Sequence, residues 1–427
     1  MYRHLQDIHG LEAGPAPGLI SKTFSLWLRG YLVRISVVVK LFYAYFKLRH
    51  QRSLTNKGGP VLLVYGHPTS TREGQDGYFG DMTRRFPALS RLLHVDCDTI
   101  RTQELCTDEK TVSLHAWGNV WDLITLPFAK WRPKSKSLAG EYGWLIHRAA
   151  ALEGGTGQAS MIEWQRRCQA RWLKDRQPDI VAWPWENHSW EREFVRQARL
   201  NGIRTLGYQH SVIGRQMLNY SPDSNPDGLA SLPDKILCTG QAMVDQLQTW
   251  GIPNNRMKIG GAFRFEARSS DNWDPDGPIY MALPFDFDTC EEMLTAARKI
   301  VDEGYKFHVK PHPMSPYPFS ESNGIIATQN HFFEEKKVSA VIYAASAVGL
   351  ESRLAGLPTI RFRPTNRISL DILPPEIELP SAGVKQLKEK LGQISRPADI
   401  SRERIFSPVN LDIWCKELGS EEQHESP

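Results

Sequence analysis

Two apolar runs of the sequence end in side chains that are able to move a proton. In VAWPWENHSWEREF (residues 181–194), Glu186 comes directly after a run that predicts a buried strand. A carboxylate there is able to act as a general base on a hydroxyl or as a nucleophile. In GYQHS, His210 ends a second such run and is a candidate base or substrate ligand. We therefore predict Glu186 and His210 as catalytic residues. The alternatives are an ion pair that supports the loop for Glu186 and a satisfied structural group for His210.

A second kind of chemistry, the neutralisation of a phosphate, is indicated by VKPHP (residues 309–313). The apolar strand brings Lys310 and His312 to its carboxyl end, and two prolines stiffen the loop that holds them. Arg264, in GGAFRF, is able to hold a phosphate or a carboxylate with two bonds. The alternative for VKPHP is a surface turn that contains basic residues.

The stretch YAASAVGLESRLAGLPTI (residues 343–360) has the composition of a nucleotide site. Small side chains surround Ser346, and a helix that begins there directs free N–H groups at an anion. One turn later, Glu351 is able to accept hydrogen bonds from a ribose diol. The alternative is a tightly packed strand–helix turn in which Gly349 and Gly356 serve packing only.

The elements that must position these residues alternate between strand and helix. Strands are predicted in 58–68 and at 179–185 and 203–210, and helices at 160–175 and 189–200. A segment rich in Pro, Asp, Ser and Gly follows at 219–234, after which the alternation continues to residue 362. This pattern predicts an α/β fold of two Rossmann-like domains facing across a cleft, with ligands at the carboxyl ends of the strands. The predicted boundaries are a basic helical segment at 1–57, an acceptor domain at 58–218, a nucleotide domain at 219–380, and a helical segment and tail at 381–427.

The N-terminal segment is unusual, because no Asp or Glu occurs from Ala13 to Arg72. On a helix, Lys22, Arg29, Lys40 and Lys47 form one line, with a stripe of apolar side chains such as Leu28, Ile35 and Phe42 on the other side. The run has too many charges to span a bilayer and is suited to the surface of an anionic membrane, as is the basic and aromatic stretch 127–136. The alternative is a long core helix whose basic residues reach water.

The composition excludes several classes of protein. The chain has 427 residues, 41% hydrophobic and 23% charged, which is typical of a folded protein with two domains. A net charge of +4 is too small to favour nucleic acid as a partner. The six cysteines are scattered without metal-site spacing, and no secretion signal is predicted at the N-terminus, so we expect a cytoplasmic protein, peripheral on the inner face of the membrane.

The pattern of KPHP followed by Ser346, Glu351 and Gly356-Leu357-Pro358 resembles the nucleotide-binding half of GT-B glycosyltransferases. More narrowly, it is similar to bacterial capsule and surface-polysaccharide enzymes that use CMP-Kdo or CMP-sialic acid, although AASA has one serine where the sialyltransferases have two. The stretches WENHSWE, GYQHSVI and KIGGAFRF also resemble proteins of surface-carbohydrate synthesis. The resemblance implies that Lys310 and His312 hold the donor phosphate, that Ser346 binds it and that Glu351 fixes the ribose. It also implies that the enzyme needs no metal and no cofactor.

We therefore expect an enzyme that transfers a sugar, such as a sugar acid from a CMP donor, to a surface polysaccharide or its lipid-linked precursor. One alternative is a glycerophosphotransferase that uses CDP-glycerol. Another is a membrane-surface scaffold that keeps a degenerate GT-B fold without catalysis.

Overall fold

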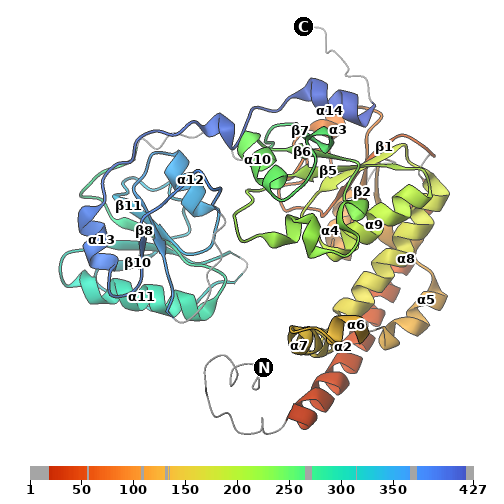
Figure 1. The fold of residues 1–427 in the computed structure, drawn as a ribbon, viewed down its shortest axis with the longest axis horizontal. Helices are drawn as coiled ribbons and strands as arrows, with labels where there is room; N and C mark the ends of the chain where they lie inside the picture. Colours follow the sequence, from red (N-terminus) through yellow and green to blue (C-terminus); the bar gives the residue numbers. More distant parts are fainter. Residues whose placement is uncertain are drawn as a thin grey trace. The chain divides into compact units, whose positions relative to one another are not determined.

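A computed structural model describes residues 19–54, 57–106, 110–129, 133, 135–264, 272–313, 315–365 and 373–419 (Figure 1). The contacts between Cα atoms divide the chain into two compact units. The first contains the described residues up to Pro184, with His188–Leu206 and the end from Glu417. The second contains Trp185–Asn187 and Gly207–Lys416.

The first sheet has seven strands in the order β3-β2-β1-β4-β5-β6-β7. The strands span Pro60–Val64 (β1), Ser90–Leu93 (β2), Thr111–Ser113 (β3), Ile180–Pro184 (β4), Arg204–Gln209 (β5), Lys235–Cys238 (β6) and Met257–Ile259 (β7). The pairs β1–β2, β2–β3, β1–β4 and β6–β7 are parallel. Every residue of β1 and β4 is buried, because helices cover both faces of a parallel sheet and leave no solvated side.

The helices that accompany this sheet include both of the predicted ones. They are α3 (Met82–Arg85), α4 (Thr99–Leu105), α5 (Val120–Thr125), α6 (Ser135–Leu138), α7 (Gly143–Gly154), α8 (Gln158–Arg176), α9 (Ser189–Leu200) and α10 (Gln241–Thr249). The helix predicted at 160–175 is α8, and the helix predicted at 189–200 is α9. At the start of α9, the Glu191 carboxylate accepts a hydrogen bond of 2.8 Å from the His188 backbone N–H. Glu191 therefore caps the helix.

The second sheet has six strands in the order β10-β9-β8-β11-β12-β13, and all neighbours pair parallel. The strands span Ile279–Ala282 (β8), Phe307–Lys310 (β9), Ile325–Ala327 (β10), Ala340–Tyr343 (β11), Thr359–Phe362 (β12) and Ser381–Ala382 (β13). The helices that go with it are α11 (Phe287–Val301), α12 (Val348–Leu354) and α13 (Leu387–Gln393) (Figure 1). One apolar core runs from the sheet to α11, with Met281, Met293 and Phe307 fully buried in it.

Both sheets use the strand order of nucleotide-binding α/β folds: two strands are added on one side of the first strand of the sheet, and the chain then crosses to the other side. The predicted α/β class with two Rossmann-like sheets is confirmed. The strands β6 and β7, which follow residue 219, belong to the first sheet, and the second sheet begins with β8. The domain boundary at residue 219 stays a prediction. The polar segment 219–234 contains short 3₁₀ helices, η5 (Pro222–Ser224) and η6 (Gly228–Ser231), after η4 (Leu218–Tyr220).

The C-terminal segment ends in α14 (Leu411–Leu418). Its Trp414 is fully buried and donates a hydrogen bond of 3.0 Å from Nε1 to the Gly260 carbonyl oxygen, next to the end of β7. The tail predicted beyond Gly419 lies outside the described residues.

The predicted N-terminal helix is α2 (Leu19–Leu48), which lies beside α7 and α8 (Figure 1). No helix in the described part of the chain is long and apolar enough to cross a membrane. The side of α2 that faces the protein carries Gly30, Arg34, Leu41, Ala44 and Leu48, all of them buried. Leu28, Ile35 and Phe42, from the predicted apolar stripe, are exposed. The structure therefore departs from the core-helix alternative, which requires that stripe to be buried.

Candidate functional site

Glu186 and His210 are in contact at the end of the first sheet. Glu186 follows β4 by two residues and His210 follows β5 by one, and the two strands are neighbours. The distance from Glu186 Oε1 to His210 Nε2 is 3.3 Å. The Glu186 side chain is 42% exposed and the His210 side chain 6%. A solvent-facing carboxylate paired with a buried imidazole is suited to take a proton from a hydroxyl at the surface.

The main chain around Glu186 is held by reciprocal hydrogen bonds. Asn187 donates from Nδ2 to the Asn219 carbonyl oxygen at 2.7 Å, and Asn219 donates from Nδ2 to the Glu186 carbonyl oxygen at 2.7 Å. Asn187 has a φ of 58°, in the left-handed region that few side chains other than Asn adopt at low cost. The Trp185 N–H donates to the Tyr208 carbonyl oxygen at 2.7 Å. The turn is therefore fixed on both sides of the carboxylate.

Arg264 lies in the loop after β7, and this loop is fastened to β5. The Tyr208 hydroxyl donates to the Gly261 carbonyl oxygen at 3.2 Å and accepts from the Phe263 N–H at 3.1 Å. Burial raises the pKa of Tyr208, and the charge of Arg264 acts against that rise. The sequence placed Arg264 in the second α/β half, whereas the structure places it with the first sheet, because β7 pairs there.

In the second sheet, Lys310 and His312 lie at the carboxyl end of β9, as predicted. Lys310 and Tyr343 are both register partners of Ala282 on the central strand β8, so they lie at one level of the sheet. Two strand spacings separate their backbones, which is about 10 Å. The His312 ring packs edge-on against Phe285, at 5.6 Å between centroids.

Ser346 lies in the turn between β11 and α12, where the strand order of the second sheet reverses. Its Oγ is buried and has no hydrogen-bond partner among the described residues. The turn is packed tightly, because a Cβ on Gly349 would lie 2.2 Å from Cζ of Tyr343. Gly349 therefore has the packing role that the alternative interpretation gives it.

Glu351 is engaged with another side chain. Its Oε2 lies 3.2 Å from Nε2 of His331, and both side chains are largely covered. A ribose that binds Glu351 would share the carboxylate with this histidine. The role of Glu351 as a ribose ligand stays a prediction.

Sequence reasoning missed an aromatic cluster at the carboxyl ends of β1 and β2. The ring of His94 lies 4.8 Å from that of Tyr65 and 4.8 Å from that of Trp190, between centroids. His94 is fully buried, and its Nδ1 lies 3.2 Å from Asp96 Oδ2. Its Nε2 is buried without a partner in the described part of the chain. Because Tyr65, His94 and Trp190 are far apart in sequence, no local signal could have revealed the cluster.

Hydrogen bonds between its own residues hold the glycine-rich loop 67–81. Asp76 is buried, and its Oδ1 accepts hydrogen bonds from the Tyr78 and Phe79 N–H groups at 2.8 and 3.2 Å. Asp76 is therefore a structural residue of this loop. Among the residues that the structure describes, no group of three or more His, Cys, Asp or Glu side chains is arranged to hold a metal ion.

Fold and site together define an α/β protein with two Rossmann-type sheets and polar side chains at their carboxyl ends. No family model matches the sequence, and no curated protein matches it. Among solved structures, a UDP-GlcNAc 2-epimerase from Neisseria meningitidis bound to UDP-GlcNAc is similar over 84% of this chain and 100% of its own, at 11% identity and a TM-score of 0.47.

Two transferases are also similar in structure. The lipopolysaccharide outer core galactosyltransferase WaaB matches 84% of this chain and 94% of its own, at 12% identity and a TM-score of 0.36. MurG from Acinetobacter baumannii matches 79% and 82%, at 11% identity and a TM-score of 0.36. At such low identities and TM-scores, none of these similarities assigns an activity to the chain.

Proposed function

We propose that this protein is a glycosyltransferase that moves a sugar from a nucleotide donor to a hydroxyl of a glycan or lipid-linked glycan. The observation that carries the proposal is the contact of 3.3 Å between Glu186 and His210. The pair follows β4 and β5, and β4 lies beside β1 at the point where the strand order of the first sheet reverses. Ligands of open α/β sheets bind outside the carboxyl ends of the strands at such points.

Glu186 is the base in this proposal, because its carboxylate is the solvent-facing member of the pair. It takes the proton of the acceptor hydroxyl while the hydroxyl oxygen forms a bond to the anomeric carbon of the donor sugar. The bond from that carbon to the phosphate oxygen breaks, and the nucleotide leaves with the electron pair. His210, which is buried, positions the carboxylate. General base catalysis of this kind contributes about 10²- to 10⁴-fold in rate.

Lys310 and His312 bind the leaving phosphate in this proposal, and the Ser346 hydroxyl donates a hydrogen bond to it. Three cationic or hydrogen-bonding side chains around the phosphate stabilise the charge as it develops. We propose a CMP-linked sugar acid as donor, since CMP leaves with a single phosphate. Arg264 then binds the carboxylate of the sugar acid. The acceptor is a bacterial surface polysaccharide or its lipid-linked precursor, at the cytoplasmic face of the membrane.

Release of the nucleotide tests the proposal. The purified protein is incubated with CMP-Kdo, CMP-sialic acid, CDP-glycerol and common UDP- and GDP-sugars, each with and without short glycan acceptors. We expect acceptor-dependent release of CMP from a CMP-sugar. Turnover of CDP-glycerol alone would replace this function with glycerophosphate transfer. No release from any donor, together with no donor binding in calorimetry, would favour the non-catalytic scaffold.

A further inference from the structure

The outer side of α2 presents a row of exposed apolar side chains. Nine of the 24 large hydrophobic residues that are exposed in the described part of the chain lie on this one helix. Among them, Leu32 is 59% exposed and Val39 is 64% exposed. The others are Phe24, Trp27, Leu28, Ile35, Phe42, Tyr43 and Phe46. Exposed apolar patches of this kind mark interaction sites on folded proteins.

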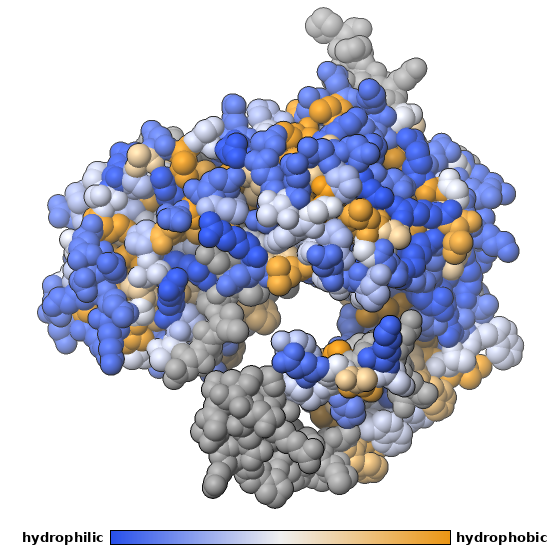
Figure 2. Space-filling view, in the orientation of Figure 1, coloured by the Kyte–Doolittle hydropathy of each residue, from blue (hydrophilic) through white to orange (hydrophobic). Residues whose placement is uncertain are grey.

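A second segment extends the row. Trp121 and Ile124 on α5 and Phe128 on η3 (Leu126–Phe128) are strongly exposed, and both elements contact α2. The rings of Tyr31 and Phe128 lie 5.9 Å apart between centroids. Figure 2 shows hydrophobic side chains at the surface over this part of the molecule, at the lower right. We call the exposed apolar residues of α2, α5 and η3 the apolar platform.

The platform is firmly attached to the body of its unit. Arg34, on the inner side of α2, is buried and donates from Nε to the Pro127 carbonyl oxygen and from Nη1 to the Gly154 carbonyl oxygen, each at 2.8 Å. At Gly30, a Cβ would lie 1.8 Å from the same Gly154 oxygen, so the backbones of α2 and α7 approach closely there.

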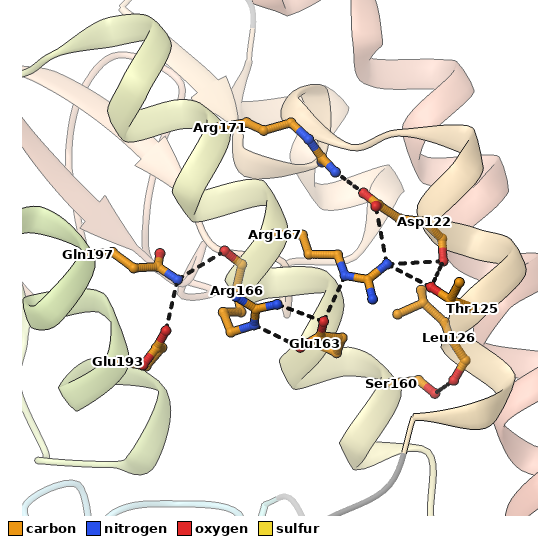
Figure 3. A network of polar contacts seen from close by, with 10 residues as sticks. All are labelled: Asp122, Thr125, Leu126, Ser160, Glu163, Arg166, Arg167, Arg171, Glu193 and Gln197. Carbon is orange, nitrogen blue, oxygen red and sulfur yellow. Dashed lines mark hydrogen bonds and ion pairs between the residues drawn. The ribbon is translucent and has the colours of Figure 1, made fainter. Parts of the chain in front are cut away.

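A polar network attaches α5 and η3 to α8 (Figure 3). Arg167 contacts Asp122 at 3.1 Å and donates to the Thr125 hydroxyl at 2.7 Å. Arg171 pairs with the same aspartate. The Ser160 hydroxyl donates to the Leu126 carbonyl oxygen at 2.6 Å. The polar groups of α5 and η3 thus bond to α8, while Trp121, Ile124 and Phe128 face solvent.

Three exposed basic residues of α2 lie along one edge of the platform. At about 100° per residue, Arg29, Lys40 and Lys47 fall within about 20° of one another, on the flank of the apolar row, between it and the buried side. All three are exposed, and no acidic residue occurs anywhere on the helix. The side chain of Lys22 lies outside the described residues.

We infer that the apolar platform docks on the surface of an anionic lipid bilayer, with its aromatic and aliphatic side chains among the acyl chains and Arg29, Lys40 and Lys47 on lipid phosphates. Charge complementarity selects this occupant, because a helix that is apolar on one side, basic on its flank and free of acids fits a negatively charged interface. Docking does not require the chemistry of Glu186, so the inference and the proposed function fail independently.

Vesicle flotation tests the inference with the full chain. We expect the protein to float with vesicles that contain phosphatidylglycerol, far less with phosphatidylcholine alone, and less as salt rises, since salt screens the basic flank. Replacing Leu32 and Val39 by Gln should abolish flotation. Leu200→Gln, at an exposed leucine on α9, is the matched control and should float like the parent protein.

A second variant separates charge from apolar contact. Arg29, Lys40 and Lys47 replaced by Gln should lower the affinity for anionic vesicles by on the order of 100-fold at low salt and flatten the salt dependence. Replacing Lys299, Lys306 and Lys336 by Gln removes the same charge elsewhere and should change little. Circular dichroism establishes that each variant is folded. Equal flotation of all variants would overturn the inference, as would concentration-dependent dimerisation through the platform without vesicle binding.

Discussion

The two sheets share one strand order, but the side chains at their carboxyl ends are of different kinds. In the first sheet, the turn after β4 holds an acid, Glu186, against the imidazole of His210. In the second, the ends of β9 and β11 carry Lys310, His312 and Ser346. The first turn is closed by hydrogen bonds within the protein, whereas the Ser346 hydroxyl is buried without a partner among the described residues. The same topology thus places an acid beside an imidazole in one sheet, and a lysine, a histidine and a serine in the other.

Removing the acid is the most direct test of the division of roles between the two sheets. Glu186→Gln keeps the size of the side chain but removes the negative charge, so we expect kcat to fall by about 10²- to 10⁴-fold. The affinity for the donor nucleotide should stay unchanged, because the second sheet is intact. Steady-state kinetics and calorimetry measure the two quantities. His188→Gln, at an exposed neighbour, is the control; an equal loss of nucleotide affinity in Glu186→Gln would refute the division of roles.

Acid should weaken the first sheet through His115. This buried imidazole accepts a hydrogen bond of 3.1 Å from Trp164 Nε1 and contacts the Val95 carbonyl oxygen at 3.1 Å, and burial lowers its pKa from 6.5 to about 4. The folded state therefore favours the neutral ring. The contribution of His115 to stability is fully present above pH 6.5 and is lost as pH falls towards 4. The loss amounts to about 3 kcal/mol of unfolding free energy.

Urea unfolding followed by tryptophan fluorescence at several pH values measures this loss. In His115→Gln the decline between pH 6.5 and 4 should be shallower, because the titrating group is gone. Parallel pH profiles for the parent protein and the variant would contradict the assignment.

A glycine at each carboxyl edge tests how tightly the two turns are packed. In Gly349→Ala the new Cβ would lie 2.2 Å from Cζ of Tyr343. In Gly207→Ala it would lie 2.9 Å from Pro233 Cγ and 3.0 Å from Trp185 Cβ. We expect overpacking to cost about 1–3 kcal/mol, more at Gly349 than at Gly207. Thermal unfolding ranks the two variants, and the reverse ranking would show that the first turn is the tighter one.

The basic side of the comparison is tested at Lys310. Lys310→Ala should weaken nucleotide binding by about 10- to 100-fold, which is the effect of losing one charge-assisted hydrogen bond. Turnover at saturating donor should change less. Calorimetry with CMP and CDP measures the effect, and Lys306→Ala, on the same segment, serves as a control. Unchanged affinity would place the nucleotide elsewhere.

The smallest effect is expected at Ser346. Ser346→Ala removes a neutral hydroxyl, so donor affinity should fall by about 2- to 10-fold. Because the hydroxyl has no partner among the described residues, the stability of the ligand-free protein should stay constant or rise. Calorimetry and thermal unfolding on the same sample give both values. A clear loss of stability would mean that the hydroxyl is structural.

The sequence predicted long and regular elements well. The strand β1 and the helices α8 and α9 carry continuous apolar or periodic patterns that fix their place. The strands β3, β10 and β13 have two or three residues each, too few for any period to emerge, and went unpredicted. The assignment of β7 to the first sheet depends on pairing with β6, which the chain order alone does not determine.

The sequence predicted the residues of the candidate site individually, but it did not predict the contacts between them. Glu186 and His210 were chosen because each follows a strand, but their pairing depends on β4 and β5 being neighbours. The pairing of Glu351 with His331 and the burial of His94 arise from segments far apart in the sequence. For α2, the basic line followed from the helical period, whereas which side faces the protein is set by Arg34 and Gly30.

The hydrogen bond from the Asn219 side chain to the Glu186 carbonyl oxygen makes the turn after β4 sensitive to deamidation. Spontaneous deamidation of Asn219 would replace the N–H donor that faces the Glu186 carbonyl oxygen with a carboxylate. Two oxygens would then repel each other across the contact that now holds the turn. Stored samples should lose turnover in proportion to the fraction of aspartate at this position. A peptide map by mass spectrometry measures that fraction in each preparation.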